Sequence, residues 1–274
     1  MDEYATHIIP APFAYREVFV SKKLLVSLAL LASPAIYAEE FLPSSDSDDA
    51  PPSPLQTEVE FGYQAHSGNT DSQSLNARVA AEYTQGRHRT SGEWKYYQLY
   101  KNGDEDKNQQ NYLLQTDYKL GPKAYLYGNY NGFSSLYSSY YEDHTVSGGL
   151  GYQIANTKTL LFEVEVGPGY RYQEPNVDEI DDKDIIFPNI VREAIVRGNI
   201  NLLWKPLNNL TLGTKLTTTS GKSNTRFDTE VNVTNAITET IALKVAYDSQ
   251  YHSKVPGTLS KRDSIFTVNL LFSF

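Results

Sequence analysis

From residue 55 onward, apolar side chains recur at every second position of the chain. In 160–172 the even positions carry Leu160, Phe162, Val164 and Val166 before two tyrosines, whereas the odd positions are mostly charged or small. Successive side chains of a β-strand point to opposite faces, so this period of two predicts strands with one apolar and one polar face. No long stretch repeats at the period of about 3.6 residues that marks an amphipathic helix.

Clusters of Gly, Pro, Asn and Asp divide this part of the chain into about twelve such segments. The predicted strands cover 56–66, 72–84, 88–101, 109–120, 124–134, 143–154, 159–173, 189–204, 210–219, 224–235, 239–252 and 262–274. Their number and spacing predict an all-β fold.

The connections between these segments alternate in length. The short ones are 85–87, 121–123, 155–158, 206–209 and 236–238, and the longer ones include 102–108, 135–142, 174–188 and 253–261. Short turns at one end and longer loops at the other are typical of membrane barrels. We therefore predict a transmembrane antiparallel up-and-down β-barrel of about 12 strands over 55–274, with lipid on the apolar face. The rival interpretation is a periplasmic or secreted β-protein.

The first 54 residues carry a different pattern. An apolar run over 24–32 follows Lys22 and Lys23 and leads to small residues ending at Ala38, which is the composition of a secretory signal peptide. We assign 1–38 to an N-terminal extension plus signal peptide, since the run is too short for a membrane anchor. The acidic, Pro- and Ser-rich segment 39–54 is predicted to be a disordered tail. Export and the barrel together predict the outer membrane of a Gram-negative cell.

Composition excludes several classes of function, and its high tyrosine content supports a membrane location. The absence of Cys excludes a disulfide framework and thiolate metal sites, and a net charge of −9 argues against nucleic acid as a partner. The 21 Tyr fit rings at the two bilayer interfaces. The candidates for these aromatic girdles are Tyr63, Tyr83, Trp94, Tyr112, Tyr118, Tyr152, Tyr172, Trp204, Tyr247 and Tyr251.

The polar face of the strands supplies the candidate site residues, a nearly balanced set of ten acids and eight bases. The predicted lumen-facing charges are Glu58, Glu60, Arg78, Glu82, Glu93, Lys95, Asp117, Lys119, Glu163, Glu165, Arg171, Arg197, Lys215, Arg226, Asp228, Glu230, Lys244 and Asp248. Such a lumen fits two alternatives, an ion-paired interior that stabilises the barrel and a narrow passive channel. An anion-selective pore would show a mainly basic track, which this set does not form.

The sequence signals for catalysis and for ligand binding are weak. His66 and Ser67 suggest a surface hydrolase as one alternative, but neighbours in sequence do not make a triad, and Ser67–Thr70 is typical of a hairpin turn. The acidic segment Glu174–Pro188 suggests a binding or adhesion role as another, and its spacing does not match a Ca²⁺ loop. We therefore expect no enzyme activity, no cofactor and no metal site.

Four short motifs carry a family resemblance. They are Ser67–Asp71 with the following Ser72–Asn76, Gly148–Tyr152, Gly167–Arg171 and the last segment, Asp263–Phe274. In this order they resemble the YdiY-like family of salt-induced outer-membrane proteins, which carry the domain of unknown function 481. The resemblance implies an outer-membrane barrel induced by salt or acid stress, with no established activity and no catalytic residues.

The end of the chain resembles the signal that the barrel assembly machinery reads on outer-membrane proteins, with Phe274 as the terminal aromatic residue. The resemblance accordingly implies that machinery as a partner during biogenesis, and membrane lipid and lipopolysaccharide as the surroundings of the folded barrel.

Overall fold

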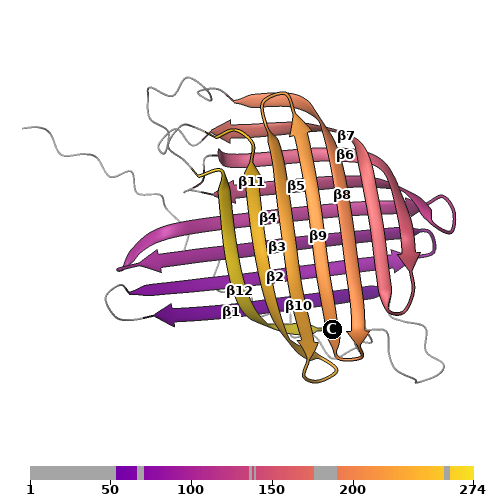
Figure 1. The fold of residues 1–274 in the computed structure, drawn as a ribbon, viewed down its shortest axis with the longest axis horizontal. Coiled ribbons are helices and arrows are strands. Elements are labelled where there is room, and N and C mark those ends of the chain that lie inside the picture. Colours follow the sequence, from indigo (N-terminus) through magenta and orange to yellow (C-terminus); the bar gives the residue numbers. More distant parts are fainter. Residues whose placement is uncertain (1–53, 67–70, 136–137, 139, 176–189, 256–259) are drawn as a thin grey trace, which may run out of the picture. The chain divides into compact units, whose positions relative to one another are not determined.

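The computed structural model describes residues 54–66, 71–135, 138, 140–175, 190–255 and 260–274. These residues form twelve strands, which pair in sequence order into one closed antiparallel barrel (Figure 1). The strands are β1 (Leu55–His66), β2 (Ser72–Gln85), β3 (His88–Lys101), β4 (Asp104–Lys119), β5 (Ala124–Ser135), β6 (Tyr140–Asn156), β7 (Leu160–Pro175), β8 (Val191–Leu207), β9 (Leu210–Gly221), β10 (Thr225–Ala236), β11 (Ile241–His252) and β12 (Arg262–Ser273). The prediction of an antiparallel barrel of about 12 strands is confirmed.

The first and last strands meet at the end of the barrel that carries the short turns. The backbones of Thr57 and Phe274 exchange hydrogen bonds of 3.0 and 2.9 Å there. The residues that join the strands at this end lie between Gln85 and His88, Lys119 and Ala124, Asn156 and Leu160, Leu207 and Leu210, and Ala236 and Ile241. We call it the short-turn end, and the opposite end the long-loop end.

One predicted loop at the long-loop end is wrong. The sequence pattern predicts a longer loop over 102–108, but β3 and β4 run on until only Asn102 and Gly103 separate them. Both residues have positive φ, 51° and 92°. The Asn-Gly pair favours such a two-residue hairpin turn, because both residues tolerate the left-handed backbone.

Replacing Gly103 with valine should lower the free energy of unfolding by about 1–2 kcal/mol, since a β-branched side chain is strained at this φ. Equilibrium unfolding in urea measures the loss. The matched change is Gly121→Val, where a Cβ would meet nothing within 4 Å. Equal losses in the two variants would contradict the argument.

The two faces of the barrel wall differ in chemistry. Large apolar side chains on the outside are exposed, among them Phe61, Val166, Val196 and Phe266 at 53, 59, 56 and 61 %. Charged and amide side chains fill the inside. An apolar outside around a polar lumen is the arrangement of membrane barrels and the reverse of a water-soluble one. Among the described residues, no helix is long and apolar enough to span a membrane.

Candidate functional site

The lumen near the short-turn end is filled by a network that we call the short-turn network: Arg89, Asp117, Tyr125, Glu163, Glu165 and Arg197. Arg89 on β3 bonds Asp117 on β4 at 2.7 Å and reaches Glu163 on β7 at 3.2 Å. Strands β4, β5 and β6 separate β3 from β7 around the barrel, so the second ion pair crosses the lumen.

Glu165 joins the other members of the short-turn network. It accepts hydrogen bonds from the Tyr125 hydroxyl at 3.1 Å and from Arg197 at 2.7 Å. The guanidinium carbons of Arg89 and Arg197 lie 5.6 and 5.2 Å from the ring centres of Tyr125 and Tyr127. Charged and aromatic groups therefore stack across this end of the lumen.

Gly151 makes room for the Tyr125 ring, because a Cβ at this position would overlap it. We expect Gly151→Ala to force the ring aside and to lower the free energy of unfolding by about 1–3 kcal/mol. Gly128→Ala is the matched control, since its nearest contact would be ordinary, with Thr116 at 3.7 Å. Comparison of both urea midpoints with that of the wild type gives the answer, and a Gly151 variant as stable as the control would refute the packing argument.

A second set of ion pairs, the β1 network, lies along β1, β2, β3, β10 and β11. Its members are Glu58, Glu60, Arg78, Glu93, Lys95, Glu230, Lys244 and Asp248. Arg78 lies 2.6 Å from each of Glu58, Glu60 and Glu93, and Lys244 lies 2.8 Å from Glu60. Lys95 on β3 crosses the lumen to Glu230 on β10 at 2.7 Å.

A third set, the long-loop network, lies toward the other end: Asp143, Arg171, Gln173, Glu193, Asn224 and Arg226. Arg226 on β10 reaches Asp143 on β6 at 2.5 Å, and the two side chains are 3 and 2 % exposed. Arg171 pairs with Glu193 and donates a hydrogen bond to the Asn224 side chain at 3.0 Å. The lumen is thus crossed a third time, between β6 and β10.

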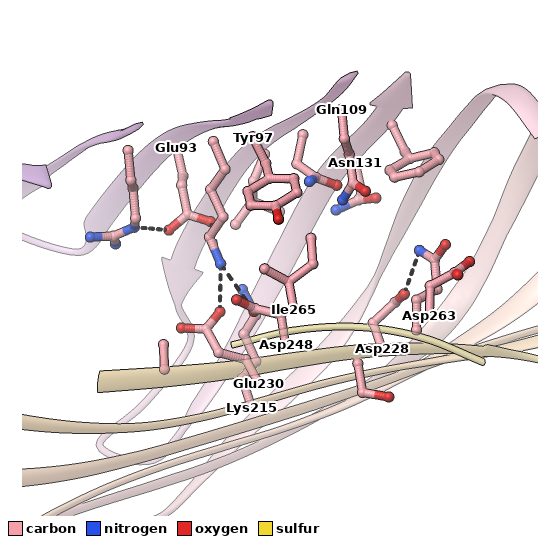
Figure 2. A pocket seen from close by; sticks show the side chains of 18 of the residues that line it. Glu93, Tyr97, Gln109, Asn131, Lys215, Asp228, Glu230, Asp248, Asp263 and Ile265 are labelled. Atoms are coloured by element: carbon pink, nitrogen blue, oxygen red, sulfur yellow. Dashed lines mark hydrogen bonds and ion pairs between the residues drawn. The ribbon is translucent and has the colours of Figure 1, made fainter. Parts of the chain in front are cut away.

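A cavity of about 270 Å³ remains inside the barrel. Figure 2 shows Glu93, Tyr97, Gln109 and Asn131 on one wall, facing Asp228, Glu230, Asp248 and Ile265 on the other. The lining includes Lys107, Ser135 and Asp263 near the long-loop ends of their strands, but not Arg89, Asp117, Tyr125 or Glu163. The cavity therefore lies toward the long loops, and the short-turn network separates it from the short-turn end.

The predicted lumen charges are placed as follows. Most belong to the three networks, and among the described residues Glu82, Lys119 and Lys215 form no ion pair. Lys215 lines the cavity, Glu82 is half-buried, Asp228 pairs with Arg226 at 2.8 Å, and Lys119 is exposed at the end of β4. Whether any of these groups has a function beyond stabilising the lumen stays a prediction.

Five ionic residues of the lumen were missed: Arg89, Lys107, Asp143, Glu193 and Asp263. Arg89 and Glu193 each lie an even number of residues from a predicted inward charge on the same strand, Glu93 and Arg197. The alternation of side chains therefore indicated these two. No inward charge was predicted on β6 or β12, and Lys107 fell in the predicted loop 102–108.

The tyrosines divide between the two faces. Outward rings such as Tyr63 and Tyr152 are 58 and 47 % exposed, as the girdle interpretation expects, whereas Tyr125, Tyr127 and Tyr140 are 1, 4 and 1 % exposed inside the barrel. The tyrosine excess is therefore only partly explained by interface rings.

The alternative hydrolase and adhesion sites rest on groups outside the described residues. Ser67 and the segment 176–189 are not described, and neither is the side chain of His66. Among the described residues, no group of three or more His, Cys, Asp or Glu side chains could hold a metal ion.

Comparison with known proteins gives one family and several barrels. The sequence profile of the family described as "Protein of unknown function, DUF481" matches residues 59–274. The uncharacterized protein YdiY of Escherichia coli (strain K12) is 25 % identical over 225 residues, which cover 80 % of this chain and 83 % of that protein.

Solved structures with a similar barrel include a NanC porin, with a TM-score of 0.47, 12 % identity and coverage of 79 % of this chain and 98 % of that one. An outer-membrane channel (COG4313) from Pseudomonas putida F1 has a TM-score of 0.46 and 11 % identity, with coverage of 84 and 100 %. Because the family profile spans most of the sequence, including all twelve strands wholly or in part, this chain belongs to the DUF481 family.

Proposed function

We propose that this protein is a non-enzymatic outer-membrane β-barrel with a structural role in the cell envelope, and that its lumen is closed to through-diffusion. The observation that supports closure is the set of three ion pairs that join strands on different sides of the lumen: Arg89–Glu163, Lys95–Glu230 and Arg226–Asp143. The apolar outside supports the membrane location, because its exposed side chains would be costly in water.

A narrow passive channel is the second candidate. The cavity of about 270 Å³, with its polar lining, favours it. The short-turn network argues against it, because charged and aromatic side chains stand where a pathway to the other end would run. Induction by salt stress, a surface hydrolase and adhesion through the 174–188 segment have no support from the described residues.

The membrane location can be tested with the two tryptophans of the chain. Trp94 and Trp204 face outward and are 37 and 48 % exposed. In vesicles of brominated phosphatidylcholine, both should be strongly quenched, since bromine on the acyl chains quenches only rings in contact with lipid.

The matched control replaces both tryptophans with phenylalanine and introduces Tyr125→Trp, a ring inside the barrel. It should keep its fluorescence in the same vesicles. Equal quenching of the inward and outward rings, or no quenching of either, would overturn the proposed location.

A further inference from the structure

The wall of the barrel is incomplete where its first and last strands meet. Strand β1 pairs with β2 along its whole length, from Leu55 opposite Tyr83 to His66 opposite Ser72. Its pairing with β12 covers the four pairs from Glu58↔Ser273 to Phe61↔Leu270, next to the hydrogen-bonded Thr57 and Phe274, and extends no further toward the long loops. In Figure 1 the arrowhead of β1 and the start of β12 accordingly lie well apart. Among the described residues, 63–66 of β1 and 262–267 of β12 therefore face an opening in the sheet.

Amide side chains form the border of this opening that lies nearer the short-turn end. Asn76 on β2 donates a hydrogen bond to the side-chain oxygen of Asn269 on β12 at 2.6 Å, and Asn269 donates one to Glu60 at 3.1 Å. Gly62 permits this contact, because a Cβ there would collide with both asparagine side chains and lie 2.9 Å from the carbonyl oxygen of Val268. The pairing of β1 and β12 thus stops where polar side chains reach over β1.

The opening joins two different environments. On the outside it is flanked by Phe61 and Tyr63 of β1 and by Phe266 of β12, which are 53, 58 and 61 % exposed. On the inside, Glu60, Asn76, Thr267 and Asn269 line the cavity. Unpaired backbone groups at an apolar surface are costly in a bilayer, where no water can satisfy them.

We propose that this opening is a lateral portal that admits a single-chain amphipathic lipid from the adjoining membrane leaflet. Its polar head would bind in the cavity, and its chain would lie outside against Tyr63 and Phe266. The acids of the cavity are mostly paired with bases, so a zwitterionic or uncharged head fits better than a strongly charged one. This proposal rests on the membrane location proposed above.

Closing the opening by a covalent link provides the test. The chain has no native Cys, so introduced cysteines can link only to each other within one chain. Continuing the register from Phe61↔Leu270 places Tyr63 opposite Val268. The pair Tyr63→Cys/Val268→Cys, joined by a disulfide or by a short bis-maleimide, should tie the two edges together. The pair Val59→Cys/Phe272→Cys is the matched control, because these residues already oppose each other.

The probe is lysophosphatidylcholine with a photoactivatable diazirine on its head, mixed into phosphatidylcholine vesicles that hold the full chain. We expect crosslinks to cavity peptides around Asn76 and Thr267 in the wild type and in the linked control. These crosslinks should be lost in the linked 63/268 variant and should return when a disulfide is reduced.

A second pair of variants does not depend on the link. Thr267→Trp fills the inner mouth of the opening and should also abolish the cavity crosslinks, whereas Thr217→Trp, on β9 in the same cavity, should retain them. Crosslinks confined to outward residues, or unchanged by closing the opening, would overturn the portal.

Two further outcomes distinguish a lipid portal from a dimer interface and from a barrel that does not insert into the membrane. Efficient disulfide-linked dimers of the single variant Tyr63→Cys would identify the occupant as a second copy of the chain and overturn the lipid proposal. Quenching of Trp94 and Trp204 reports insertion independently, so its absence would refute the membrane location, whereas quenching without cavity crosslinks would refute the portal alone.

Discussion

Arg226→Met is expected to lower the free energy of unfolding by about 3–5 kcal/mol, because it leaves a buried carboxylate without its cation. Asp143 lies 2.5 Å from the Arg226 guanidinium and is 2 % exposed. In the variant, its described side-chain contacts would be reduced to the amide of Gln173 at 2.7 Å. The same change would also release Asp228 and Asn131, which Arg226 bonds at 2.8 and 3.3 Å.

Equilibrium unfolding in urea from lipid vesicles measures this loss. The control is Lys101→Met, which removes an exposed pair with Asp106 and should cost at most about 1 kcal/mol. The double variant Arg226→Met/Asp143→Leu should recover part of the loss, since the uncompensated charge is gone. An Arg226 variant as stable as the Lys101 control would show that the long-loop network does not hold the barrel together.

The alternation of side chains, together with the alternating lengths of the connections, predicted the barrel and the two faces of its wall. The rule that placed Glu163 and Glu165 inward also applies to Arg89 and Glu193, which lay within the predicted strands. Asp143 was harder, because it is the first residue of the predicted strand 143–154, on which no inward charge was predicted. Local sequence therefore determines which face a residue occupies.

Which partner each lumen residue finds was not predictable from the pattern. Lys95 and Glu230 are 135 residues apart and meet because the closed sheet brings β3 opposite β10. The inward rings of Tyr125 and Tyr127 likewise depend on the space that Gly151 and the arginines leave. Tyrosine suits both an interface and a polar interior, so composition alone could not divide them.

The opening between β1 and β12 has the same origin. Each strand alone shows regular alternation up to its long-loop end, and each pairs over most of its length with its other neighbour. The length of their mutual pairing depends on how the whole sheet closes, which is a property of strand tilt and stagger rather than of local sequence.

The largest functional effect is expected from Arg89→Ala/Tyr125→Ala. These two side chains stack across the short-turn end, with the guanidinium 5.6 Å from the ring centre. Removing both should join the cavity to the other side of the membrane. The acids Asp117, Glu163 and Glu165 would remain with less positive charge around them, so the pathway should select cations.

The matched control is Arg87→Ala/Tyr118→Ala, which deletes the same side chains from exposed positions outside the lumen. Insertion of every variant is checked by the lipid quenching of Trp94 and Trp204. This check distinguishes a protein that has not inserted from an inserted barrel that is closed.

Recordings of ionic current across planar bilayers test the central claim, that cross-lumen ion pairs and the short-turn network close this barrel. The wild type and the Arg87/Tyr118 control should show no discrete conductance steps at high or low salt. The Arg89/Tyr125 variant should show discrete, cation-selective steps. Steps of equal size in the wild type and in that variant, or an inserted variant that stays silent, would contradict the claim.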